Sequence, residues 1–213
     1  MRTDDLVTML ATGAGAVAPN QALRRHVAAL AWGVLGAALL MAALLGPRHD
    51  LLQALLLPMF WIKLAFAACV AAASLAAALR LSRPGQRLAW VPGVLGAPVL
   101  ALWLLAALVL ARADAAQRAI LFFGDTWDVC PFLIALLSVP GFVAAMRAMQ
   151  GLAPTRLRMA GAAAGLLAGA VATLVYSLHC PEMAAPFIGF WYPLGMLIPT
   201  AAGALLGPRL LRW

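Results

Sequence analysis

Long apolar stretches separated by short polar segments follow one another along the chain from about residue 26 onward. A helix that crosses a membrane needs roughly 20 mostly apolar residues, and six stretches meet that requirement, the fourth being the shortest. Pairs such as Gly46 with Pro47 stop a helix and bound these stretches. The pattern predicts an all-α membrane protein built as a bundle of six transmembrane helices. The predicted spans cover about residues 26–45, 54–79, 88–111, 130–146, 159–179 and 186–206.

The composition agrees with a lipid bilayer as the surroundings of most of the chain. Of 213 residues, 65% are hydrophobic and 10% are charged, whereas an ordinary soluble domain has about 25% charged residues. Disorder is excluded as well, because it needs low hydrophobicity and high charge. The net charge of +8 would suggest a nucleic-acid partner for a soluble protein. In a membrane protein it indicates orientation instead, and we expect no direct contact with nucleic acid.

Arginines in the connecting segments predict how the bundle is oriented. With both termini in the cytoplasm, eleven basic residues are inside and three outside, an excess that is typical of cytoplasmic loops. We therefore expect a bacterial inner-membrane protein in which residues 1–25 form a cytoplasmic segment and residues 26–213 the transmembrane domain. Residues 1–25 lack the pattern of a cleavable signal peptide, so the first span is expected to be an uncleaved anchor. The inner set is Arg2, Arg24, Arg25, Arg80, Arg83, Arg87, Arg147, Arg156, Arg158, Arg209 and Arg212, and the outer set is Arg48, Arg112 and Arg118.

Small residues at every fourth position mark the fifth and sixth predicted spans. Gly161, Gly165 and Gly169 line one face of the fifth span, and Gly203 and Gly207 repeat the spacing in the sixth. Such faces let two helix backbones approach closely in lipid. We expect close packing inside the bundle, with a homodimer contact through the fifth span as the alternative.

Aromatic residues fall toward the ends of the predicted spans. Trp127, Trp191 and Tyr192 lie toward the outer end, and Trp90 lies near the inner end. Tryptophan and tyrosine are enriched where a membrane meets water. The pattern predicts a belt of interfacial anchors rather than a binding site.

Two of the three cysteines come together in the predicted topology. Cys69 lies among alanines in mid-span and is expected to be a small buried hydrophobe. Cys130 and Cys180 are each followed by proline, and both fall at the outer membrane face, which is the oxidising periplasm in a Gram-negative cell. A structural disulfide, a reactive or metal-binding thiol pair, and two unrelated thiols are all compatible with this placement. The predicted helix N-terminus at Cys130 favours thiolate and hence reactivity.

Other polar side chains near the two cysteines are candidates for a redox or metal site. His179, Asp128, Glu182 and His49 are expected to supply a second shell or further ligands for a soft metal ion. We expect no resident cofactor, and a heavy-metal ion would bind only transiently at Cys130 and Cys180.

One basic residue lies inside a predicted span. Lys63 stands about two turns or more from the outer end of the second span, and ionisable residues at such positions are functional candidates. Its partners are expected to be backbone carbonyls, or Asp125 and Asp128 if the side chain extends outward to water. The alternative is an electrostatic partner for the thiolates.

The first residues of the chain predict a short amphipathic helix. Thr3 is a helix cap, and Asp4 and Asp5 favour the positive end of a helix. Leu6, Val7, Met9 and Leu10 then form an apolar face for about two turns, and Gly13 and Gly15 end the helix. So short a helix is marginal alone, so it is either a segment that folds into a partner's groove or a frayed tail.

Taken together, these segments resemble the NrsF family of integral-membrane anti-sigma factors. The resemblance runs essentially end to end, and its most specific part is the two Cys-Pro pairs in a frame of six spans. The residues that carry it are Thr3-Asp4-Asp5-Leu6-Val7, Leu10-Ala11, Arg48-His49-Asp50-Leu51, Phe60-Trp61-Ile62-Lys63-Leu64, Cys130-Pro131, Leu178-His179-Cys180-Pro181, Trp191-Tyr192 and Leu206-Gly207-Pro208-Arg209.

The resemblance implies a regulator rather than an enzyme. Members of the family hold an extracytoplasmic-function (ECF) sigma factor inactive at the inner membrane. The sigma-binding part then corresponds to the region around Asp4, Asp5, Leu6 and Leu10. Two periplasmic cysteines of the family are linked to heavy-metal or oxidative stress. They correspond to Cys130 and Cys180.

Our hypothesis is an inner-membrane anti-sigma factor that releases its ECF sigma factor when the cysteine pair senses stress. A membrane thiol oxidoreductase is the alternative, although the sequence has no CxxC pair. A structural subunit of a membrane complex is the other alternative, supported by the glycine face of the fifth span.

Overall fold

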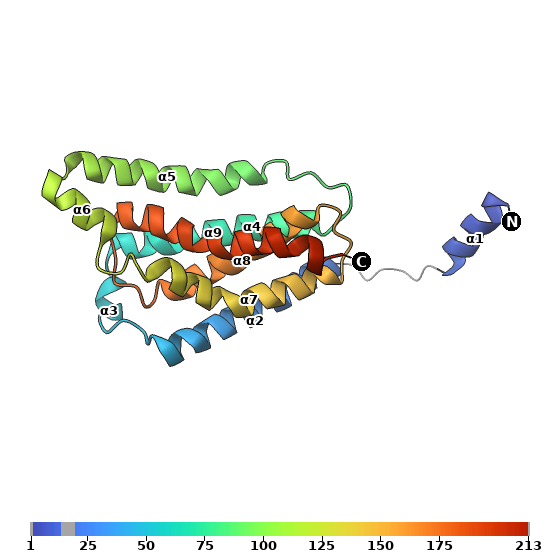
Figure 1. The fold of residues 1–213 in the computed structure, drawn as a ribbon, viewed down its shortest axis with the longest axis horizontal. Helices are drawn as coiled ribbons and strands as arrows, with labels where there is room; N and C mark the ends of the chain where they lie inside the picture. Colours follow the sequence, from blue (N-terminus) through green and yellow to red (C-terminus); the bar gives the residue numbers. More distant parts are fainter. Residues whose placement is uncertain (1, 14–19, 213) are drawn as a thin grey trace.

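The computed structural model describes residues 2–13 and 20–212, and the regular elements in that part of the chain are helices (Figure 1). Six of them are long and apolar enough to cross a membrane, which confirms the six-span prediction. They are α2, α4, α5, α7, α8 and α9, whereas α3 and α6 are short helices in the connections. The bounds are α1 (Thr3–Gly13), α2 (Gln21–Leu44), α3 (Leu51–Ala54), α4 (Pro58–Leu81), α5 (Val91–Arg112), α6 (Ala115–Phe123), α7 (Cys130–Gln150), α8 (Leu157–Tyr176) and α9 (Ala185–Leu210).

The fourth span is longer than the sequence predicted. α7 has 21 residues and runs to Gln150, so the shortest spanning helix is α8, with 20 residues. The expected end at Met146 was wrong because Arg147 does not stop the helix. Its exposed side chain lies in the last turn, where a positive charge suits the helix dipole.

Helix α8 is the centre of the bundle, and 78% of the residues in its most apolar stretch are buried inside the protein. It packs most extensively on α9, and also on α7, α4 and α2. A Cβ on Gly161 or Gly165 would overlap backbone carbonyls of α9, so only glycine permits this approach. The predicted packing through this face is confirmed. Because α9 of the same chain covers the face, it is not free for the homodimer contact that was the alternative.

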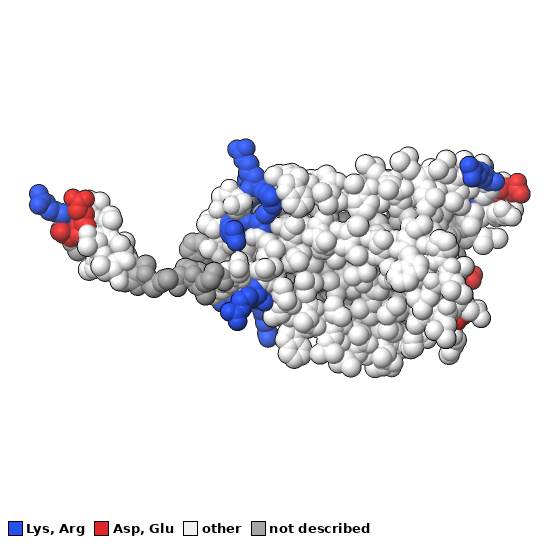
Figure 2. Space-filling model, turned by 180° about the vertical axis from the view of Figure 1, so that it is seen from behind, with Lys and Arg blue, Asp and Glu red and all other residues white. Residues whose placement is uncertain are grey.

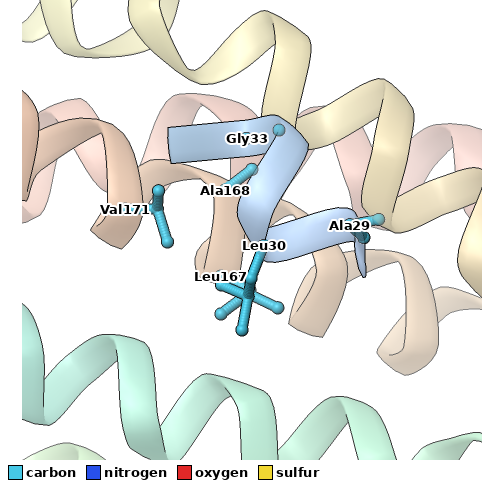
Figure 3. A pocket seen from close by; sticks show the side chains of 8 residues that line it. Ala29, Leu30, Gly33, Leu167, Ala168 and Val171 are labelled. Carbon is cyan, nitrogen blue, oxygen red and sulfur yellow. The ribbon is translucent and has the colours of Figure 1, made fainter. Parts of the chain in front are cut away.

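Helices α2, α7 and α8 meet at another set of small residues. A Cβ on Gly33 of α2 would lie 3.0 Å from the Cα of Gly141 of α7, and a Cβ on Gly141 would lie 3.5 Å from the Cβ of Ala168 of α8. Figure 3 shows Gly33 and Ala168 side by side at this point. The void between the three helices is only about 10 Å³ and is lined by apolar residues. The three helices therefore form a closely packed unit.

Helix α5 lies at the edge of the bundle, against α4 and α9. Only 6% of the residues in its most apolar stretch are buried. Its exposed apolar surface is expected of a helix that faces lipid. Cys69 of α4 lines a shallow space beside α5 and is exposed. The expectation that Cys69 is buried was therefore wrong, because the face of α4 that carries it turns toward the edge of the bundle.

The two ends of the bundle differ in charge. The C-terminal end of the chain lies at the end of the bundle where most arginines gather, which we call the arginine end (Figures 1 and 2). The opposite end, which we call the cysteine end, carries the first residue of α7 and the connection between α8 and α9. The carboxylates of the bundle belong to the cysteine end. They are Asp50, Asp114, Asp125, Asp128 and Glu182.

Helix α1 stands apart from the bundle beyond the arginine end (Figure 1). The predicted short helix is confirmed over Thr3–Gly13, while the expected stop at Gly15 lies outside the described residues. The side chains of residues 2–12 are exposed. The helix therefore presents its apolar residues without covering them.

Candidate functional site

Cys130 and Cys180 lie together at the cysteine end. Cys130 is the first residue of α7, and Cys180 follows α8, with its backbone N–H donating to the carbonyl of Tyr176 at 2.9 Å. Both side chains are fully buried, and both lie beside the hydroxyl of Tyr176. The predicted placement at one face is confirmed. Both are free thiols, so the disulfide alternative does not describe this state.

Two tyrosines complete the buried cluster around the thiols. Tyr176 and Tyr192 are the only tyrosines of the chain, both are fully buried, and their ring centroids lie 6.1 Å apart. The Tyr192 hydroxyl lies beside Cys180 and Ser177, yet it has no hydrogen-bond partner among the described residues. Sequence reasoning missed Tyr176. The signal that marks it is its position one helical turn before Cys180 on an otherwise apolar span.

The predicted aromatic belt was wrong for two of its outer members. Tyr192 is fully buried and Trp191 is 8% exposed, because α9 packs against neighbouring helices at these positions. The indole N–H of Trp191 donates to the carbonyl of Phe122 at 2.8 Å, and its ring packs on that of Trp127. Trp127 itself is 43% exposed, as an interfacial residue would be. These aromatics cover the cysteine end.

Lys63 reaches the same cluster from α4. Its side chain is fully buried, and its amine donates to the carbonyls of Cys180 at 2.9 Å and Glu182 at 3.3 Å. The expectation of backbone carbonyl partners is confirmed. The alternative contact with Asp125 and Asp128 was wrong, because the segment after Cys180 closes over the lysine before it can reach water.

Arg48 holds the same carbonyl from the connection after α2. Its guanidinium donates to the carbonyl of Cys180 at 3.4 Å, and its backbone N–H donates to Leu178. The guanidinium also forms an ion pair with the carboxylate of Asp50 at 2.6 Å. This hydrogen bond raises the pKa of Arg48 and lowers the pKa of Asp50. Two basic side chains therefore fix the backbone of Cys180.

The residues predicted as a metal shell do not surround the thiols. Nδ1 of His179 donates to the carbonyl of Gly46 at 2.8 Å, while His49 and Asp128 are exposed. Glu182 accepts the backbone N–H of Asp125 at 2.8 Å. Over residues 2–13 and 20–212, no group of three or more His, Cys, Asp or Glu side chains could hold a metal ion. His179 and Glu182 are instead used to join connecting segments to each other.

The arrangement is suited to thiol chemistry at a helix junction. A thiolate is the form of cysteine that reacts with oxidants and binds soft metal ions, and two neighbouring sulfurs can become a disulfide or share one ion. Each sulfur here belongs to a different spanning helix or its end. A bond between them would therefore tie the start of α7 to the segment after α8.

Comparison with known proteins adds the family. The model of the family described as "NrsF: Negative regulator of sigma F" matches residues 10–213. The chain belongs to the NrsF family. The NrsF match covers all six spanning helices, the cysteine cluster and Leu10, whereas Asp4, Asp5 and Leu6 precede it. A description as a negative regulator agrees with the prediction that the chain is not an enzyme.

Two curated NrsF proteins are similar over their whole lengths. The chain is 63% identical over 213 residues to the "Probable anti-sigma-F factor NrsF" of Azospira oryzae, and 39% identical over 217 residues to the "Anti-sigma-F factor NrsF" of Caulobacter vibrioides. In both cases the similarity covers 100% of each chain, including the N-terminal segment. No solved structure matches this chain.

Proposed function

We propose that this protein is an anti-sigma factor of the bacterial inner membrane, which binds an ECF sigma factor and holds it away from RNA polymerase. Full-length similarity to two NrsF proteins, one of them 63% identical, is the observation that carries the proposal. The excess of arginine at one end of the bundle supports cytoplasmic termini. Green fluorescent protein fused to the C terminus should therefore fluoresce, whereas alkaline phosphatase fused there should be inactive.

Helix α1 is the proposed contact for the sigma factor. Leu6 and Leu10 are one turn apart and are 40% and 65% exposed, so they form an apolar ridge for a partner's groove. Asp4 and Asp5 lie in the first turn and add negative charge beside that ridge. Residues 1 and 14–19 of the proposed sigma-binding segment lie outside the described residues.

A deletion and a pair of matched substitutions test this assignment in membranes that contain the whole protein. Deletion of residues 2–12 should release the sigma factor. L6D/L10D should do the same, because each change places a charge on the apolar ridge. T8D/T12D adds the same charges at the same spacing on the other side of α1 and should retain the sigma factor. A sigma factor that stays bound to the deletion variant would refute the contact.

The cysteine cluster is the proposed sensor. Two thiols give up two electrons and two protons when they form a disulfide, and a periplasmic oxidant such as hypochlorous acid accepts the electrons. A thiophilic heavy-metal ion would instead replace the protons and join the sulfurs. Either event pulls Cys130 of α7 toward Cys180 at the end of α8. α7 packs on α2, and α2 begins at the arginine end, so a shift of α7 has a physical route to that end.

The sensor is tested by sigma-dependent transcription after exposure to hypochlorous acid or to Cd²⁺. C130S/C180S should fold, keep the sigma factor bound and abolish the response, because serine provides no thiolate. C69S is the matched control, since Cys69 is exposed on α4 and should leave the response intact. A full response in C130S/C180S would refute the sensor but would leave the anti-sigma function untouched.

A further inference from the structure

A groove opens between α2 and α7 on the surface of the bundle, and its volume is about 480 Å³. The two helices touch at Gly33 and Gly141, and a Cβ on Gly36 would lie 2.5 Å from the Cβ of Pro140. The groove extends from this contact toward the arginine end. Its walls there are residues 25–28 of α2 on one side and residues 143–147 of α7 on the other. It is separate from the cysteine cluster, which lies at the other end of both helices.

Two arginines form the end of the groove that is nearest the membrane surface. Arg25 lies about 12 Å along α2 from Gly33, and Arg147 lies about 9 Å along α7 from Gly141. In the part of the chain that the structure describes, the salt bridge found is Arg48 with Asp50 at the cysteine end. Arg25 and Arg147 therefore face the groove without a carboxylate to neutralise them.

The rest of the groove is apolar and open to lipid. Trp32, at the end near the helix contact, is 67% exposed, and Val143 is 44% exposed. The side chains of Ala28 and Ala144 are small, so they leave a channel open between the two helices. A guest that fills this groove must have an anionic head and a hydrocarbon body.

We infer that the groove binds one anionic phospholipid. Its phosphate lies between Arg25 and Arg147, and one acyl chain runs past Val143 to Trp32. Guanidinium groups pair with phosphate oxygens through two parallel hydrogen bonds, and basic pockets between transmembrane helices at the membrane surface suit anionic headgroups. Charge decides between lipids, because a zwitterionic headgroup brings a cation of its own next to the two arginines. The site holds α2 and α7 together near the N-terminal segment, and it does not depend on a sigma factor.

Quenching of tryptophan fluorescence by brominated lipid tests the site in the full-length protein. The protein is placed in nanodiscs of phosphatidylcholine that contain increasing amounts of acyl-brominated phosphatidylglycerol, or of brominated phosphatidylcholine. The chain has 7 tryptophans, so the signal of Trp32 is the difference between the protein and W32F. Phosphatidylglycerol should quench Trp32 with a relative binding constant about 25-fold above that of phosphatidylcholine, since each of the two arginines gives roughly a fivefold preference.

Two kinds of variant separate the groove from the general charge of the surface. R25Q/R147Q should reduce the preference to near unity, whereas R156Q/R158Q removes two exposed arginines of the same end outside the groove and should keep it. A28L/A144L keeps all charges but fills the channel, and it should weaken quenching by both lipids. Circular dichroism checks that each variant is folded.

Three results would overturn the inference. One is an unchanged preference in folded R25Q/R147Q together with unchanged quenching by both lipids in folded A28L/A144L. The second is an equal loss in R156Q/R158Q, which would mean that only the net charge of the surface matters. The third is full displacement of phosphatidylglycerol by millimolar glycerol phosphate, which would show an anion site that makes no use of the apolar groove.

Discussion

At the scale of single residues, the backbone carbonyl of Cys180 joins separate parts of the chain at the cysteine end. It accepts hydrogen bonds from the buried amine of Lys63 and from Arg48, although the two donors come from different parts of the chain. A carbonyl that loses its partners inside a protein costs the free energy of its desolvation. The two basic side chains therefore hold the segment that carries one of the two thiols.

Replacement of Lys63 by methionine should loosen that segment. K63M keeps the length of the side chain but removes the amine that bonds the buried carbonyl of Cys180 and the partly buried carbonyl of Glu182, so it should lower the free energy of unfolding by about 2 kcal/mol. Cys180 should also react faster with a maleimide. R48Q, which removes a longer and partly exposed contact, should have a smaller effect on both. Equal maleimide rates in K63M and the unaltered protein would contradict this role.

The two buried tyrosines should respond in opposite directions to loss of the hydroxyl. The Tyr176 hydroxyl lies beside both thiols and, unlike that of Tyr192, is not a buried polar group without a partner, so Y176F should destabilise the protein by about 1 kcal/mol and change the reactivity of the pair. The Tyr192 hydroxyl is buried without a partner, so Y192F should be neutral or stabilising by up to about 1 kcal/mol. Unfolding in detergent measures both. A larger loss in Y192F than in Y176F would reverse the assignment.

Sequence reasoning identified the thiols and Lys63 but not the tyrosines. A cysteine or a lysine in an apolar span is unusual by its chemistry alone, so its type marks it. Tyrosine is ordinary near a membrane surface, and its role depends on which way α8 and α9 are rotated about their axes. That rotation is set by packing between distant helices, which explains why Tyr192 was expected at the interface and is found in the core.

At the scale of elements, the contact between α8 and α9 determines the architecture. The glycine spacing predicted that the fifth span approaches a neighbour closely, so this part of the fold could be predicted from the sequence. The sequence did not indicate that α8 is central and α5 peripheral, because both are equally plausible as apolar spans. Burial of 78% against 6% reflects small residues on α8 and bulky ones on α5.

Single methyl groups should therefore act differently on the two helices. A Cβ on Gly165 would overlap the carbonyl of Pro199, so G165A should lower the free energy of unfolding by about 2 kcal/mol through overpacking. G96A on α5 has nothing within 4 Å and should be neutral or slightly stabilising, since alanine is the better helix former. Thermal unfolding of the two variants in one detergent measures the difference. Equal stability would contradict the close contact.

At the scale of the whole molecule, the proposed sensor and the proposed sigma-binding helix lie at opposite ends. Only a movement of whole helices can connect them, and a ligand shifts such an equilibrium only if it binds the two states differently. The contact of α2 with α7 is the link that we propose between them, since α7 begins at Cys130 and α2 begins at the arginine end. The topology predicted these two ends, but the link depends on glycines whose partners no sequence pattern indicated.

A substitution at this link should act downstream of the cysteines. A Cβ on Gly36 would lie 2.5 Å from the Cβ of Pro140, so G36A should push α2 away from α7. It should thereby imitate the shift of α7 that we propose for the oxidised or metal-bound protein. It should release part of the sigma factor without an oxidant, and it should do so equally in C130S/C180S, which lacks the proposed sensor thiols. G93A, which meets nothing within 4 Å, is the matched control and should keep the sigma factor bound. Sigma factor recovered with the membranes, measured before and after oxidation, distinguishes these states. If G36A folds and retains the sigma factor fully in the C130S/C180S background, the signal does not pass through the contact of α2 with α7.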